Sequence, residues 1–165
     1  MRALLLIVAL AASACVLASD HVSTELHAVC TEDVPLPFRR VAAGRAVAEV
    51  EVDDVGASVD APEAHATLDV MTLEAGRGID DFAFADSMAM DLLAPGREDA
   101  RVAALDPMPP AATVSADGDR DVDLVDYLTS DRLTVRIALT GDIPADGFLA
   151  TFSACIDVEG IAVED

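Results

Sequence analysis

The feature that most restricts the fold of this chain is a strict alternation of apolar and polar or small residues. The clearest run places apolar side chains at every second position, on Leu133, Val135, Ile137 and Leu139. Successive side chains of a β-strand point to opposite faces, so this period of two predicts a half-buried strand. Two further runs, over 46–52 and 148–158, follow the same rule.

Weaker runs and turn-forming residues divide much of the remaining chain into short segments. The weaker strand patterns cover 22–30, 64–73, 84–93, 101–106 and 112–116. Proline and glycine, which favour tight connections, mark breaks at 60–62, 74–78, 94–96, 106–110 and 141–147. About seven or eight strands predict an all-β fold, a two-sheet antiparallel β-sandwich with immunoglobulin-like or jelly-roll-like topology. Two short segments, 79–82 and 121–130, could form single helical turns.

The N-terminus has the layout of an export signal. Arg2 gives it a positive start, and residues 3–12 form an apolar run, too short for the roughly 20 residues of a membrane-spanning helix. The next residues, Ala12-Ser13-Ala14-Cys15, resemble the lipobox of bacterial lipoproteins, whose cysteine receives a diacylglyceryl group. The resemblance implies a signal peptide over 1–14, a lipidated Cys15 with a tether over 15–27, and a single β-sandwich domain over 28–165.

The site of processing has alternatives. Ala12 stands where the lipobox favours leucine, and Val16-Leu17-Ala18 before Ser19 suits ordinary signal peptidase. An uncleaved anchor is a third outcome. Lipidation implies an envelope protein held to a membrane through its N-terminal lipid. The bacterial sorting rule then favours the outer membrane, because no Asp follows Cys15. Cleavage before Ser19 implies a periplasmic or secreted protein.

Two cysteines remain once Cys15 is assigned to the lipid. Disulfides form in oxidising compartments, so export predicts a bridge between Cys30 and Cys155 that ties the first strand to the last. Two unpaired buried thiols are the alternative. The alternation over 148–158 turns Cys155 away from the face that carries Phe152. The bridge therefore calls for a bulge or an edge position.

The charge of the chain excludes several partners. Asp and Glu number 31 against ten basic residues, which gives a net charge of −21. Phosphates repel such a chain, so we expect no binding to nucleic acid and no electrostatic binding to anionic lipid. All the basic residues are Arg, and Lys, Asn and Gln are missing, which is typical of a GC-rich genome and also fits adaptation to salt. The whole layout resembles the uncharacterised acidic β-sandwich lipoproteins of GC-rich bacteria, a resemblance that implies no activity.

The sequence shows no catalytic constellation. Its imidazole bases are His21, His27 and His65, and Ser58 lacks the second glycine of a nucleophile elbow. His21 and His27 have no further zinc ligand near them in the sequence. No glycine-rich loop opens a helix that could hold a nucleotide. These observations favour a non-enzymatic protein without a resident cofactor.

One acidic segment is a candidate calcium site. Residues 115–123 place carboxylates at every second position, on Asp117, Asp119, Asp121 and Asp123. Calcium takes six to eight oxygen ligands, which Asp-rich loops can supply. The segment is not an EF-hand, because Val122 and Leu128 stand where that motif has glycine and glutamate. The alternative is a solvated acidic loop in which Arg120 relieves the repulsion.

Two hypotheses for the function follow. The first is a non-enzymatic exported envelope lipoprotein, a structural or binding β-sandwich at the cell surface or in the periplasm, whose ligand and partner the sequence does not name. The second is a calcium-dependent or carboxylate-based hydrolase with a site assembled from scattered acids. A cleft lined by carboxylates with strongly perturbed pKa values would favour the second.

Overall fold

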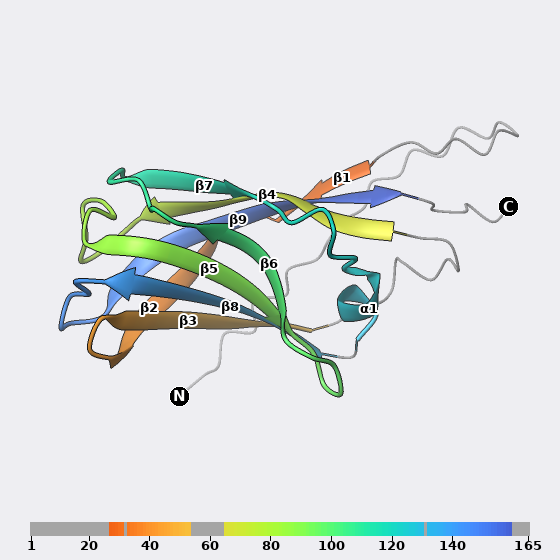
Figure 1. Cartoon of the computed structure of the whole chain (residues 1–165), viewed down its shortest axis with the longest axis horizontal. Helices are drawn as coiled ribbons and strands as arrows, with labels where there is room; N and C mark the ends of the chain where they lie inside the picture. The colour runs from red at the N-terminus through yellow and green to blue at the C-terminus, as the bar shows by residue number, and fades with distance from the viewer. Residues whose placement is uncertain (1–26, 32, 54–64, 131, 160–165) are drawn as a thin grey trace, which may run out of the picture.

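Antiparallel strands make up most of the part of the chain that the computed structural model describes, which is residues 27–31, 33–53, 65–130 and 132–159 (Figure 1). The elements are β1 His27–Cys30, β2 Val34–Ala42, β3 Arg45–Asp53, β4 His65–Ala75, β5 Ala85–Leu93, β6 Ala100–Leu105, β7 Thr113–Asp117, α1 Val125–Leu128, β8 Arg132–Gly141 and β9 Phe148–Glu159. The predicted all-β antiparallel class is confirmed. The predicted signal peptide, Cys15 and the tether up to residue 26 lie outside the described residues.

Eight of these nine strands fall where the alternation predicts them, and β2 is the exception. Pro35 and Pro37 lack the N–H group that a strand ladder uses, which hides β2 from sequence patterns. The half of β2 that carries them pairs with β9 and has no second strand neighbour among the described residues. Sheets tolerate proline at such edges. The helix α1 lies within the predicted segment 121–130, whereas 79–82 forms no helix.

The strands form one hydrogen-bonded sheet that folds back on itself. Their order is β6-β5-β8-β3-β2-β9-β4-β7, and β1 also pairs with β9. Strand β2 joins the two halves, because residues 34–38 pair with β9 and residues 39–42 pair with β3. At the two ends of this order, Ala103 of β6 forms an isolated bridge with Gly118, the residue that follows β7. The sheet is therefore nearly closed.

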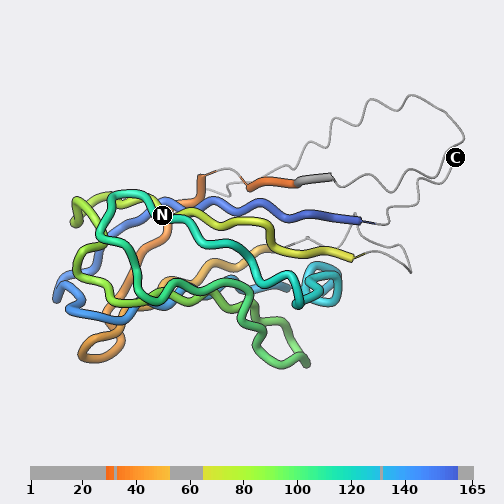
Figure 2. Tube along the Cα trace, turned by 45° about the horizontal axis from the view of Figure 1, so that its top comes forward, coloured from red at the N-terminus to blue at the C-terminus, as the bar shows by residue number. Residues whose placement is uncertain are grey.

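The two halves of the curved sheet lie on opposite sides of the core (Figure 2). We call β1, β4, β7, β9 and residues 34–38 the β9 layer. The β8 layer consists of β3, β5, β6, β8 and residues 39–42.

Apolar side chains fill the space between the layers. Phe38 and Phe148, opposite each other on β2 and β9, stack with ring centroids 4.9 Å apart. Phe84 meets Phe148 edge-on at 5.3 Å. Elsewhere between the layers, beside Leu124 and Leu128, mostly aliphatic side chains leave a cavity of about 100 Å³. No polar or charged side chain is buried among the described residues.

The predicted disulfide between Cys30 and Cys155 is present. The two residues are directly opposed in the pairing of β1 with β9, so the bridge ties the first strand to the last. Along β9, Phe152 and Val158 are buried, whereas Cys155 is only half-buried. Cys155 therefore lies on the opposite face of the strand from Phe152, as predicted. The bridge needs no bulge between the two strands, because β1 takes an edge position beside β9.

Candidate functional site

The predicted acidic segment connects β7 to α1, and its backbone is anchored on both layers. The N–H group of Gly118 donates to the carbonyl oxygen of Asp69 on β4 at 2.9 Å. The N–H group of Asp119 donates to the carbonyl oxygen of Val102 on β6 at 2.7 Å. Gly118 is required here, because a Cβ atom would overlap the carbonyl oxygen of Leu68. The backbone of the segment therefore links β6 to the paired strands β4 and β7.

The four aspartates of this segment are spread along it and are not gathered in one cluster of the described residues. Asp117 ends β7 and is exposed, and Asp121 is exposed in the turn that follows. Asp119 accepts a hydrogen bond from the backbone N–H of Asp121 at 3.0 Å. Within the described ranges, no three His, Cys, Asp or Glu side chains gather where they could hold a metal ion. Calcium binding and a solvated acidic loop stay the two alternatives for this segment.

Asp123 uses both of its carboxylate oxygens within the protein. Oδ2 lies 2.9 Å from Nδ1 of His65, the first residue of β4. Oδ1 accepts hydrogen bonds from the N–H groups of Ala66 at 3.3 Å and Val125 at 3.0 Å. Partial burial opposes ionisation, but these hydrogen bonds outweigh it and hold the pKa of Asp123 below its usual value. Asp123 therefore ties the start of α1 to β4.

Arg120 binds the outer face of the β9 layer. Its Nη2 lies 2.6 Å from Oδ1 of Asp69, and its Nη1 lies 3.8 Å from Oδ2 of Asp157. The guanidinium thus lies between carboxylates of two neighbouring strands, β4 and β9. It offsets repulsion on the sheet as well as in its own segment.

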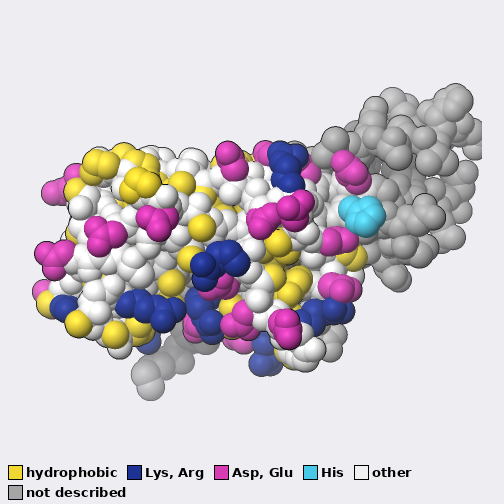
Figure 3. Space-filling view, in the orientation of Figure 1, with side chains coloured by type: hydrophobic (Ala, Val, Ile, Leu, Met, Phe, Trp, Pro, Cys, Tyr) yellow, Lys and Arg dark blue, Asp and Glu magenta, His cyan; other side chains and the backbone are white. Residues whose placement is uncertain are grey.

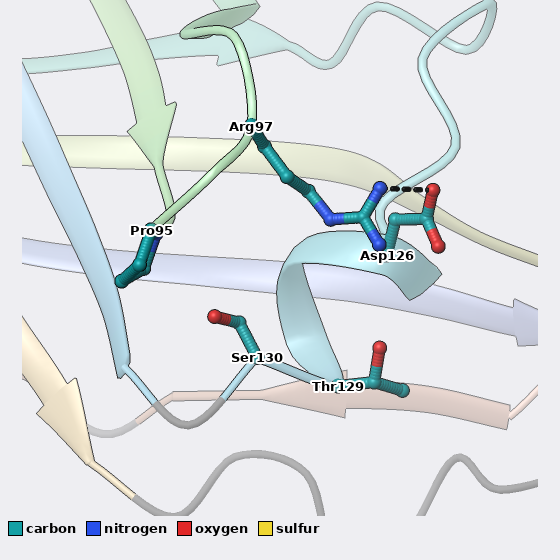
Figure 4. Close-up of a pocket in the computed structure, with 5 residues that line it drawn as sticks. All are labelled: Pro95, Arg97, Asp126, Thr129 and Ser130. Carbon is teal, nitrogen blue, oxygen red and sulfur yellow. Dashed lines mark hydrogen bonds and ion pairs between the residues drawn. The ribbon is translucent and has the colours of Figure 1, made fainter.

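A shallow hollow of about 280 Å³ lies beside α1 (Figure 4). Arg97, from the β5–β6 turn, reaches across it to Asp126 on α1, with Nη1 and Oδ2 2.6 Å apart. The hydroxyl groups of Thr129 and Ser130 donate to backbone carbonyl oxygens at 2.9 and 3.1 Å. The residues that line the hollow include no imidazole that could activate either hydroxyl. The hollow is suited to weak contacts with polar groups.

A row of alternating charges crosses the outer face of the β8 layer. Glu49, Arg136, Asp91 and Arg101 are successively opposite one another on β3, β8, β5 and β6. Nε of Arg136 lies 2.7 Å from Glu49, and Nε of Arg101 lies 2.6 Å from Asp91. These hydrogen bonds raise the pKa of both arginines above the usual value. The acidic and basic side chains of this row neutralise one another. Acidic and basic side chains are also interspersed over the face shown in Figure 3.

These pairs could not be predicted from the sequence, because the partners lie far apart along the chain. His65 and Asp123 are separated by 58 positions, and Glu49 and Arg136 by 87. One indication is visible in the sequence, because the strand residues His65, Glu49 and Arg136 each lie at a polar position of the alternation. Pairing them requires the strand order. Two other candidates, His21 and Ser58, lie outside the described residues.

No helix in the described ranges is long and apolar enough to cross a membrane. No protein-family model matches the chain, and neither a similar curated protein nor a similar solved structure was found.

Proposed function

We propose that the protein is a non-enzymatic lipoprotein of the bacterial cell envelope, anchored through Cys15. The disulfide between Cys30 and Cys155 carries the proposal, because such bridges persist in oxidising compartments outside the cytoplasm. The export signal over 1–14 supplies the route. Val16 after the lipidated cysteine favours the outer membrane as the destination.

The fold that we propose for this role is a two-sheet β-sandwich with immunoglobulin-like or jelly-roll-like connections. Two observations support it. The layers pack face to face over one apolar core, and β2 passes from one layer to the other. Strands that switch sheets make the corners of many two-sheet folds.

The role that we propose for the domain is binding or structural support. Ion pairs between neighbouring strands hold part of its charged surface in place, as in the row from Glu49 to Arg101. The bridge on the outer face of the β9 layer fixes the strand nearest the proposed tether. A rigid domain on a short tether is suited to hold a partner close to the membrane.

Substitution of the lipidated cysteine tests the anchor. Cells that express wild type or Cys15→Ser are grown with a fatty-acid analogue and then fractionated. Wild type should carry the label and follow the membranes, because two or more acyl chains anchor firmly. Cys15→Ser should lose both properties. The matched control, Cys30→Ser with Cys155→Ser, should keep the label. An unlabelled wild type that begins at Ser19 would contradict lipid anchoring.

A further inference from the structure

Within the part of the chain that the structure describes, the second half of β3 is an open edge of the nearly closed sheet. Strand β3 pairs with β8 from Arg45 to Asp53. On its other side it pairs with β2 only over 45–47, because the first half of β2 belongs to the β9 layer. Among the described strands, none pairs with the other side of residues 48–53, which extends over about 20 Å at the usual rise of a strand.

An apolar cavity lies directly behind this edge. Its volume is about 100 Å³, and Val50 and Val52 of β3 line it together with Val34 and Ile156 of the β9 layer. These four side chains are only half-buried, although they lie between the layers. Thr31 supplies the one polar residue of the lining. A buried water needs two to four polar partners, so the lining favours an apolar guest.

We propose that the open edge of β3 and this cavity form a strand-addition site for an extended segment of a partner polypeptide. The added strand pairs with residues 48–53 and directs every second side chain into the cavity. Main-chain hydrogen bonds then supply affinity, and the cavity selects the inward side chains. The inference rests on the binding role proposed above and does not depend on the lipid anchor.

The charge around the edge identifies the chemistry of the partner. Glu51 lies between the inward Val50 and Val52 of β3, and Asp33 is exposed beside Val34. Arg132 lies 3.4 Å from Glu51, and both side chains are more than half exposed, which leaves room for a second cation. A second copy of this chain would bring a further net charge of −21 against these acids. The partner segment therefore alternates apolar residues with Arg or Lys.

A synthetic peptide tests the site. The probe is an end-blocked, fluorescent nine-residue peptide that alternates valine with arginine, and its control has the same composition with the valines in one block. Binding to the purified protein is measured by anisotropy at high salt, and amide hydrogen exchange locates it. The alternating peptide should bind at least about tenfold more tightly than the control and should slow exchange at 48–53. Equal binding of both peptides, no binding, or protection elsewhere would overturn the proposal.

Two variants of β3 separate the cavity from the rest of the strand. Val50→Phe fills the cavity and should weaken binding of the alternating peptide by about tenfold. Val47→Phe, on the opposite face of β3, is the matched control and should leave the affinity within about twofold. If Val50→Phe does not melt cooperatively, the exposed charge reversal Glu51→Lys takes its place, with the same expected direction. Unchanged affinity in both folded variants would overturn the site, whether or not Cys15 carries lipid.

Discussion

At the scale of single residues, Asp123 is the acid of its segment with the most partners in the fold. Its carboxylate accepts hydrogen bonds from two backbone N–H groups and contacts His65. Asp123→Ala should lower the free energy of unfolding by about 1 kcal/mol, measured by urea denaturation at neutral pH. Asp126→Ala is the control, since its exposed pair with Arg97 is worth about 0.5 kcal/mol or less. Equal losses in the two variants would contradict this account.

The lowered pKa of Asp123 predicts how the stability of the fold depends on pH. Its pKa is lower in the folded chain than the unfolded value of about 3.9, so the unfolded state takes up protons first on acidification. The stabilisation by Asp123 is therefore complete above that unfolded value and is lost as the pH falls through the folded pKa. The stability difference between wild type and Asp123→Ala should shrink below about pH 4. A difference that grows as the pH falls below about 4 would count against the hydrogen bonds.

Gly118 is the second residue whose identity the fold requires, for a steric reason. Gly118→Ala should cost about 3 kcal/mol, because the new methyl group meets the rigid backbone of Leu68. Gly96→Ala separates this cause from backbone strain. Gly96 has a φ of +78°, and no atom lies within 4 Å of the place that a methyl group would take, so that variant should lose only about 1 kcal/mol. Equal melting temperatures of the two variants would argue against the steric overlap at Gly118.

At the scale of elements, the disulfide is the strongest link between distant parts of the chain. It joins β1 to β9 across 125 positions. Replacing Cys30 and Cys155 with serine should cost about 2–5 kcal/mol in free energy of unfolding, mainly through a freer unfolded chain. Peptide mapping without reductant should recover the cross-linked pair from wild type. Two free thiols in the exported protein would contradict the assignment.

The elements also show what the sequence can predict and where it stops. Strand β8 is evident because Leu133 to Leu139 alternate strictly, and all four apolar residues are buried. Strand β2 is hidden by its two prolines, although its Leu36 and Phe38 are core residues. The acidic segment is visible as a pattern, but its contacts with β4 and β6 depend on strand order. Local periodicity carries no information on which strands become neighbours.

At the scale of the whole molecule, the net charge of −21 governs the response to salt. Exposed charges are screened over about 8 Å at physiological ionic strength and about 3 Å at 1 M. The melting temperature should therefore rise with sodium chloride, as self-repulsion weakens. A melting temperature that falls or stays constant with salt would mean that the ion pairs outweigh this repulsion.

Calcium is tested separately from ionic strength. A ligand that binds only the folded state raises the melting temperature by mass action. With ionic strength held constant, millimolar calcium should add no further rise, because Asp123 is engaged by backbone groups and the described acids form no cluster. The comparison includes the double variant Asp119→Ala with Asp121→Ala. A calcium-dependent rise that disappears in this variant would establish a site at the acidic segment.

The intact mass of the protein purified from cell envelopes tests whether it is an exported lipoprotein with one disulfide. We predict a chain that begins at Cys15, carries diacylglyceryl and acyl groups, and gains two hydrogen atoms on reduction of the bridge between Cys30 and Cys155. A mass without lipid that begins at Ser19 or at Met1, or one that reduction leaves unchanged, would contradict it.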